Sequence, residues 1–232
     1  MTKTTLGNPL CVALDSTDRA RITDIAEATL GYVGMYKIGM TSFISFGSEL
    51  VEELRVRLPV FLDLKLHDIP VQVEGAVRAA AEVGASYVTV HAAGGDEMIR
   101  AAVDAAGKMK VLAVTVLTSL DDTRLARMRL PATRDLVERF AETALDAGAD
   151  GLVCSAHELD YLRERFGPAD EDGPLLVVPG IRMLAAVDDQ RRTATPAGAL
   201  AAGADILVVG RPITQASDPG AAARDLLKSL ER

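Results

Sequence analysis

Residues 60–91 read VFLDLKLHDIPVQVEGAVRAAAEVGASYVTVH. The stretch opens with an apolar run at 60–65 and closes with another at 87–91, and both are almost continuously hydrophobic rather than alternating. Such runs are typical of parallel strands that are buried on both faces. Between them an Ala-rich segment at 71–83 predicts a helix, and Gly84 supplies the left-handed residue that ends one. We therefore predict a strand–helix–strand unit.

The same unit recurs along the whole chain. A Gly-Ala pair joins a helical segment to the next apolar run at 84–85, 148–149 and 203–204. Strands are predicted at 10–14, 35–38, 60–65, 87–91, 111–117, 151–154, 175–178 and 206–209. Helices are predicted at 19–30, 48–57, 71–83, 97–106, 134–147, 158–166, 196–202 and 219–230. Eight units in 232 residues indicate an α/β fold, a (β/α)₈ TIM barrel, with residues 1–232 as a single domain.

An open, doubly wound sheet is the alternative fold. It usually has fewer strands at this length, and no Gly-x-Gly-x-x-Gly pattern follows the first predicted strand. The barrel is favoured for both reasons.

Composition excludes several classes of protein. The 49% of apolar residues indicates a globular chain, and the net charge of −8 argues against a general nucleic-acid binder, because phosphate backbones require a basic surface. No apolar run is long enough for a transmembrane helix, and the N-terminus has no signal-peptide core, so we expect a cytoplasmic protein without membrane contact. Cys11 and Cys154 lie in apolar runs and are expected to be reduced core residues. No Cys/His cluster has the spacing of a zinc site, and no metal ligand set is predicted.

The barrel fold predicts that polar residues at the carboxyl ends of strands carry the chemistry. Lys37, Asp63, Lys65 and Asp68 form an alternating set of charges at the ends of the second and third predicted strands. A lysine between carboxylates stays protonated, so Lys65 is better suited to donate a proton than to form a Schiff base. A buried structural network of ion pairs is the alternative.

A second group follows the seventh and eighth predicted strands, where many barrels bind phosphate. Gly180, Arg182, Gly210 and Arg211 combine close backbone approach with bidentate hydrogen bonding, although tight turns with surface arginines would look similar. Residues 183–195 form a long loop that we predict to be a lid. The remaining polar residues at strand ends are Asp15, Thr118, Ser119, His67 and His91, the two histidines being at least as well explained by structural roles.

These residues resemble a known family. DLKLHDIP at 63–70 is similar to the D-x-K-x-x-D-I signature of the orotidine 5′-phosphate decarboxylases of bacteria. Further segments resemble the same family in the same order: VALD at 12–15, YKIG at 36–39, VHA at 90–92, VTVLTS at 114–119, VCSA at 153–156, PGIR at 179–182, DQRR at 189–192 and GRPIT at 210–214.

The resemblance implies a cofactor-independent decarboxylation of orotidine 5′-phosphate to UMP in pyrimidine biosynthesis. Lys65 would protonate C6 of the pyrimidine, with Asp63 beside the departing carboxylate and Lys37 and Asp68 completing the charged network. Asp15 and Lys37 would hold the ribose, Thr118 and Ser119 would lie near the pyrimidine, and Arg182, Gln190, Gly210 and Arg211 would bind the 5′-phosphate. The resemblance also implies a homodimer in which Asp68 and Ile69 reach the partner's site.

Two positions depart from the family pattern. Gln72 stands where the signature usually has a threonine of the substrate site, and the loop after Arg182 begins Met183-Leu184-Ala185 rather than with the usual Pro-x-Gly. Two alternatives also stay open. One is a magnesium-dependent relative that acts on sugar phosphates, although such relatives carry Glu at the position of Lys37. The other is a barrel that binds a phosphorylated ligand without catalysis.

Overall fold

A computed structural model describes residues 7–181 and 195–230 of the chain. Eight parallel strands form a closed barrel in which each pairs with its neighbours in sequence and β8 pairs with β1. The strands are β1 (Leu10–Ala13), β2 (Met35–Gly39), β3 (Val60–Leu66), β4 (Tyr87–His91), β5 (Lys110–Val114), β6 (Gly151–Val153), β7 (Leu175–Pro179) and β8 (Ile206–Val209). The predicted (β/α)₈ barrel is confirmed.

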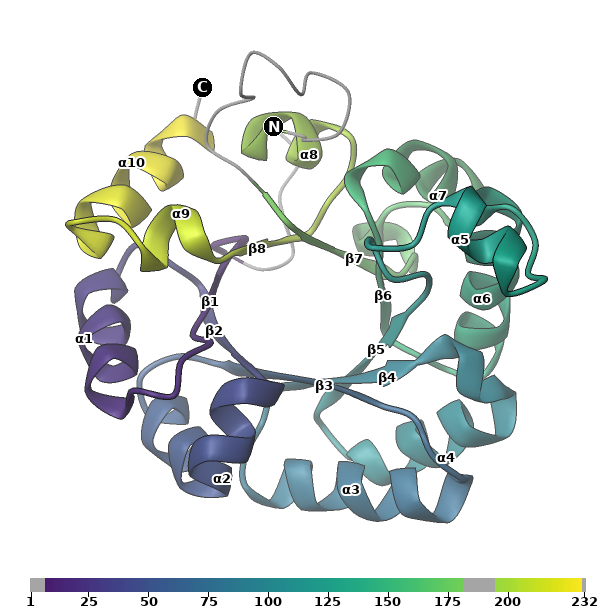
Figure 1. Ribbon diagram of the computed structural model, residues 1–232, viewed down its shortest axis with the longest axis horizontal. Helices are drawn as coiled ribbons and strands as arrows, with labels where there is room; N and C mark the ends of the chain where they lie inside the picture. The colour runs from purple at the N-terminus through teal and green to yellow at the C-terminus, as the bar shows by residue number, and fades with distance from the viewer. Residues whose placement is uncertain (1–6, 182–194, 231–232) are drawn as a thin grey trace.

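Helices surround the barrel on its outside (Figure 1). The α-helices are α1 (Arg19–Thr29), α2 (Met40–Arg55), α3 (Pro70–Glu82), α4 (Gly95–Ala106), α5 (Asp122–Arg127), α6 (Thr133–Asp146), α7 (Leu159–Phe166), α8 (Pro196–Ala201), α9 (Arg211–Thr214) and α10 (Pro219–Leu230). Short 3₁₀ turns occur at η1 (Ala92–Gly94), η2 (Ala156–Glu158) and η3 (Ala169–Glu171). Among the residues that the structure describes, no helix is both long enough and apolar enough to cross a membrane.

The three Gly-Ala joints share one geometry. Gly84, Gly148 and Gly203 have φ values of 88°, 93° and 101°, the left-handed region that glycine adopts without a steric penalty. At each joint the N–H of the following alanine donates to the carbonyl five residues earlier, as in Ala85 to Ala80 at 3.1 Å. This is the Schellman ending of a helix, and it turns the chain directly into the next strand.

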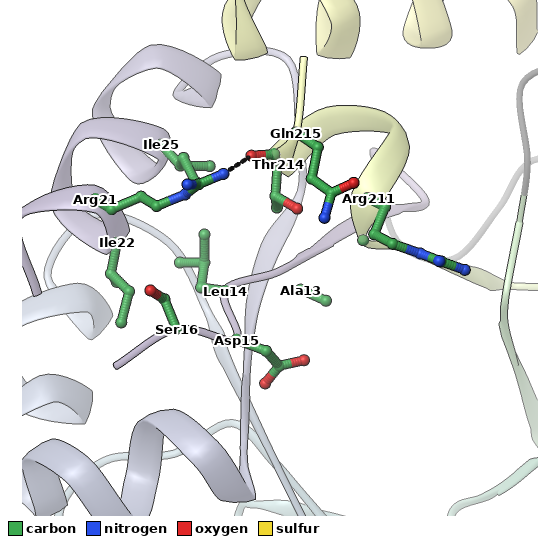
Figure 2. A pocket seen from close by; sticks show the side chains of 11 residues that line it. Ala13, Leu14, Asp15, Ser16, Arg21, Ile22, Ile25, Arg211, Thr214 and Gln215 are labelled. Atoms are coloured by element: carbon green, nitrogen blue, oxygen red, sulfur yellow. Dashed lines mark hydrogen bonds between the residues drawn. The ribbon is translucent and has the colours of Figure 1, made fainter. Parts of the chain in front are cut away.

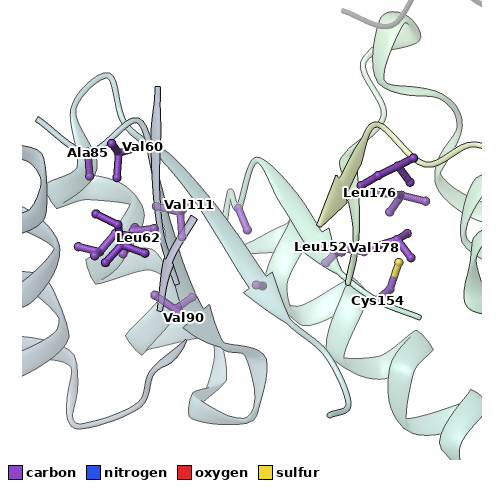
Figure 3. Packing of buried hydrophobic residues seen from close by; sticks show 14 of the residues in the cluster. Val60, Leu62, Ala85, Val90, Val111, Leu152, Cys154, Leu176 and Val178 are labelled. Carbon is purple, nitrogen blue, oxygen red and sulfur yellow. The ribbon is translucent and has the colours of Figure 1, made fainter. Parts of the chain in front are cut away.

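Successive side chains of each strand point alternately outward to the helices and inward to the barrel, which divides the core into two parts. One set of side chains packs between strands and helices; Figure 3 shows Leu62 and Val90 in one part of this layer and Leu176 and Val178 in another. The other set fills the barrel and includes Met35, Phe61 and Tyr87. Residues two positions further along a strand point to the same face. Lys37, Asp63 and Thr89 therefore form the next layer of the barrel interior toward the carboxyl ends of the strands.

Two predicted elements differ from the structure by more than two residues at one end. The strand predicted at 111–117 is β5, which ends at Val114, because the apolar residues after it enter the loop that leads to α5. The helix predicted at 48–57 is α2, which begins at Met40 and contains a break at Gly47 with φ 62° and ψ −153°. The predicted helix covers only the part of α2 that follows this break.

Candidate active site

Four charged side chains form a continuous chain at the carboxyl ends of β1, β2 and β3. The Lys37 Nζ lies 3.0 Å from Asp15 Oδ2 and 3.4 Å from Asp63 Oδ2. The other carboxylate oxygen of Asp63, Oδ1, lies 2.7 Å from the Nζ of Lys65. Positive and negative groups thus alternate from Asp15 to Lys65, and the structure brings together four of the residues predicted to form the site.

Burial and neighbouring charges act in opposite directions in this chain. The side chains of Lys37 and Asp63 are only 9% and 13% exposed. Burial alone would lower the pKa of Lys37, but the carboxylates of Asp63 and Asp15 outweigh it and leave the pKa raised. Burial alone would raise the pKa of Asp63, but Lys37 and Lys65 outweigh it and leave the pKa lowered. Both groups therefore keep their charges across the neutral pH range.

The backbone that carries Lys65 is irregular. Leu62 pairs with Val88 and Leu66 pairs with Val90, so four steps along β3 match two steps along β4. Within this bulge Lys65 has φ 51°, a left-handed conformation that is uncommon for a residue with a side chain. Asp63 and Lys65 are two residues apart and their side chains are in direct contact, but this contact forms across a bulge and not along a regular strand.

Asp15 is held by a residue that sequence reasoning did not single out. The N–H of Gly39 donates to Asp15 Oδ1 at 3.0 Å. A Cβ atom at position 39 would lie 2.2 Å from the same oxygen, so any larger residue would displace the carboxylate from this position. The signal in the sequence is a glycine two residues after Lys37, at the end of an otherwise apolar strand.

Asp68 and Ile69 lie apart from the charged chain, in the loop between β3 and α3. Both are exposed, and within residues 7–181 and 195–230 Asp68 forms no salt bridge. The Asp68 Oδ1 instead accepts a hydrogen bond from the N–H of Ile69 at 2.7 Å. Asp68 is thus not part of the charged chain formed by the residues of its own subunit that the structure describes, and its completion of the network in a partner's site stays a prediction.

The two histidines lie beside this loop. The rings of His67 and His91 stack with centroids 5.4 Å apart, and His91 Nδ1 accepts a hydrogen bond from the N–H of Ala93. Burial, with His67 and Lys65 nearby, lowers the pKa of His91. These contacts give His91 the structural role that the sequence allowed.

A second part of the barrel mouth, formed by the ends of β1 and β8, adjoins the charged chain at Asp15. A cavity of about 340 Å³ here is lined by Asp15, Gly210 and Arg211, together with residues of α1. Figure 2 shows the side chains of Asp15 and Arg211 extending from this part of the mouth into the same open space. The Arg21 guanidinium donates to the carbonyl oxygen of Thr214 at 2.9 Å and so ties α1 to α9, the short helix that begins with Arg211.

Other predicted residues lie farther around the mouth of the barrel. Thr118 and Gly180 line one pocket between the ends of β5 and β7; Gly180 follows β7 as predicted, whereas Thr118 lies in the loop beyond the end of β5. Ser119 is exposed in the same loop as Thr118, and Gln72 is exposed in the first turn of α3. Arg182, Gln190 and most of the predicted lid at 183–195 lie outside the described residues.

Comparison with known proteins gives the family of this barrel. The sequence profile of the "Orotidine 5'-phosphate decarboxylase / HUMPS family" matches residues 8–226. The chain belongs to this family. An orotidine 5′-phosphate decarboxylase of Anaeromyxobacter dehalogenans is 52% identical over 95% of this chain and 97% of the relative. One of Thermobifida fusca is 48% identical over 97% and 96%.

A solved structure agrees with this membership of the decarboxylase/HUMPS family. The crystal structure of orotidine 5′-phosphate decarboxylase from Lactobacillus acidophilus matches with a TM-score of 0.85 and 36% identity, covering 97% of this chain and all of that one. The resemblance inferred from the signature at 63–70 is therefore confirmed at the level of the family and the fold.

Proposed function

We propose that this chain is an enzyme that decarboxylates orotidine 5′-phosphate to UMP and CO₂ in pyrimidine nucleotide biosynthesis. The observation that supports this most is the alternating chain Asp15–Lys37–Asp63–Lys65 at the mouth of a barrel of this family. The substrate is inferred from the names of the relatives. The arrangement of charges is consistent with a reaction that needs no cofactor.

Lys65 is the proton donor in this proposal. When the bond between C6 and the carboxylate carbon breaks, CO₂ leaves and the electron pair stays on C6. The ammonium of Lys65 stabilises this developing negative charge and then transfers a proton to C6, and the neutral lysine is reprotonated from solvent. The 2.7 Å contact with Asp63 fixes the ammonium before the substrate binds, so little reorganisation is needed at the moment of reaction.

Lys37 supports a metal-independent reaction. Its ammonium lies between the carboxylates of Asp15 and Asp63, the position that a divalent cation would need to occupy to use both as ligands. We therefore assign the site to the decarboxylase branch rather than to relatives that use magnesium and act on sugar phosphates.

The remaining predicted residues bind the substrate. Asp15 and Lys37 contact the ribose, and Thr118 and Ser119 lie near the pyrimidine. The phosphate is held by Gly210 and Arg211, which follow β8 directly, with Arg182 and Gln190 from the segment after β7. Because the phosphate is remote from the bond that breaks, its binding energy can assist the chemical step at a distance.

A homodimer completes the site. Ile69 and Val71 at the start of α3 are 60% and 63% exposed, and they lie beside Asp68, which has no cationic partner in the described part of its own chain. We propose that Asp68 and Ile69 enter the partner's site, with Gln72 in the position that usually holds a threonine. One such dimer contains two shared sites, related by the two-fold axis of a homodimer.

The metal-independent route is tested by adding orotidine 5′-phosphate to the protein with and without EDTA. We expect UMP to form at the same rate in both samples, because Lys37 provides the cation between the carboxylates. If EDTA abolishes turnover and magnesium restores it, the assignment to the metal-independent branch is wrong.

A further inference from the structure

Thr89 is a polar residue at the centre of the apolar strand β4. It is fully buried, and it belongs to the same interior layer as Lys37 and Asp63. Its position opposite the bulge of β3 is fixed by its neighbours, because Val88 pairs with Leu62 and Val90 pairs with Leu66. One residue of β4 thus faces the segment that contains both Asp63 and Lys65.

The hydroxyl of Thr89 contacts both of these residues. Its Oγ1 accepts a hydrogen bond from the backbone N–H of Lys65 at 2.8 Å. The same hydroxyl donates to Asp63 Oδ1 at 3.0 Å. One hydroxyl has one proton to give and lone pairs to accept with, so both bonds can form together.

These bonds close a ring that begins and ends at Lys65. The carboxylate oxygen that receives the Thr89 proton is the same Oδ1 that contacts the Lys65 Nζ at 2.7 Å. The two ends of Lys65, its backbone N–H and its ammonium, are therefore connected through one hydroxyl and one carboxylate oxygen. Movement of any member changes the direction in which the ammonium points.

The bulge makes this ring necessary. Lys65 has φ 51°, and the left-handed conformation is unfavourable for a residue with a side chain unless its surroundings hold it. The N–H of Lys65 is directed at the side chain of Thr89, which takes the place of a carbonyl of a regular ladder. A buried N–H without an acceptor is itself unfavourable, so the hydroxyl favours the bulged conformation over a regular strand.

We propose that Thr89 is a positioning residue that holds the ammonium of Lys65 and the carboxylate of Asp63 in their reactive arrangement. This inference depends on the proposed role of Lys65 as proton donor. Thr89 acts through those two residues and does not touch the substrate. Its hydroxyl is therefore required for the chemical step and not for binding of UMP.

The test compares Thr89→Val with Thr89→Ser. Valine keeps the branched shape and removes both hydrogen bonds, whereas serine keeps the hydroxyl and loses only a methyl group. If the valine variant does not fold, Thr89→Cys gives the same comparison, because a thiol is only a weak donor and acceptor. Each variant is measured for kcat and KM with orotidine 5′-phosphate, for UMP affinity and for thermal stability.

Thr29→Val is the matched control. Thr29 is a fully buried threonine on α1, and its hydroxyl donates to the carbonyl of Ile25 at 2.8 Å, away from the charged chain. The control loses a buried hydroxyl in the same way, so it shows what a loss of stability alone does to the rate.

We expect Thr89→Val to lower kcat by about 10- to 100-fold, the effect of a small misplacement of a reacting group, with UMP affinity unchanged. Thr89→Ser and Thr29→Val should keep the kcat of the wild type. The inference is overturned if Thr89→Val, or Thr89→Cys in its place, keeps the wild-type kcat, or if UMP affinity falls in parallel with kcat. A wild-type protein without turnover would instead contradict the proposed function itself.

Discussion

Asp63 is the residue on which the charges of the site converge. One of its carboxylate oxygens lies near Lys37 and the other near Lys65, and the hydroxyl of Thr89 donates to the second. A buried carboxylate between two ammonium groups is stable only in its ionised form. Any change that neutralises Asp63 leaves two positive charges close together in the barrel mouth.

This arrangement predicts how the stability of an Asp63→Asn variant depends on pH. The pKa of Asp63 is lowered in the folded protein, so its carboxylate contributes stability that is fully present above the unfolded-state pKa of about 4. That contribution is lost as pH falls through the lower folded pKa. At pH 7 we expect the variant to lose on the order of 2 kcal/mol of unfolding free energy, since Lys37 still has Asp15 as a partner.

Urea unfolding of both proteins from neutral to acidic pH measures this difference. The difference in unfolding free energy between the wild type and Asp63→Asn should become smaller in acid, because a protonated Asp63 is neutral like asparagine. Asp104→Asn, on the exposed face of α4, is the control and should have the same unfolding free energy as the wild type at each pH. If the difference in unfolding free energy between the wild type and Asp63→Asn stays constant down to acidic pH, the charge of Asp63 does not stabilise the fold.

Asp63 and Lys65 could be identified from the sequence because charged residues in a buried apolar strand are unfavourable unless they are paired or have a function. Thr89 carries a weaker form of the same signal, a hydroxyl in the centre of YVTVH at 87–91, but threonine is also a common strand residue. The left-handed Lys65 could not be predicted, because the bulge depends on the register between β3 and β4. Arg21 and Gly39 likewise gain their contacts from elements that are distant in sequence.

At the scale of elements, an aspartate follows two of the three Gly-Ala joints. Each aspartate precedes one strand and accepts a backbone hydrogen bond from the neighbouring strand. Asp150 Oδ2 accepts from the N–H of Val111 at 2.8 Å, and Asp205 Oδ2 accepts from the N–H of Leu176 at 2.7 Å. Asp205 also pairs with the guanidinium of Arg163 of α7. These contacts lie at the amino ends of β5 and β7, away from the charged chain.

The two aspartates allow a matched comparison of stability. The side chains of Arg163 and Asp205 are 13% and 11% exposed, whereas those of Lys110 and its partner Asp150 are 46% and 34% exposed. Asp205→Ala removes a backbone acceptor and leaves a buried guanidinium without its carboxylate, at a cost of about 3–5 kcal/mol. Asp150→Ala removes a similar backbone acceptor beside a solvated lysine and should cost about 1–2 kcal/mol.

Unfolding of the wild type and the two variants in guanidinium chloride measures this difference in stability. The affinity for UMP should be unchanged in both variants. Equal losses of stability would mean that the buried Arg163–Asp205 pair contributes nothing beyond the backbone hydrogen bond.

Strands and helices were predictable where apolar runs and Gly-Ala joints coincide, as at 60–91. They were less predictable where hydrophobicity continues past a strand. Val116 is buried although it lies beyond the end of β5, so burial alone did not distinguish strand from loop. The early start of α2 could not be inferred either, because the break at Gly47 has the same sequence signal as a helix end.

At the scale of the whole molecule, the proposed dimer makes each site depend on two chains. Lys65→Ala and Asp68→Ala should each be nearly inactive as homodimers. In a mixed dimer, one site combines the intact Lys65 of one chain with the intact Asp68 of the other. Random mixing should therefore restore about a quarter of the sites, because half of the dimers are mixed and each contains one complete site.

Mixing Lys65→Ala with Asp63→Ala is the control for this complementation. Both residues belong to one chain's half of the site, so neither site of that mixed dimer is complete and no activity should return. Complementation that is absent in the first mixture, with mixed dimers shown to form, would contradict the sharing of Asp68 between chains.

The proposed decarboxylation depends on a fixed ammonium at Lys65, which stabilises the charge on C6 and donates the proton. The most direct measurement follows the loss of ultraviolet absorbance when orotidine 5′-phosphate is added to the wild type and to Lys65→Ala, with UMP affinity measured for both. We predict rapid loss of absorbance with the wild type, a rate lower by at least about 10²–10⁴-fold with the variant, and UMP binding by both. No absorbance change with micromolar wild-type protein, or full activity of Lys65→Ala, would contradict the account.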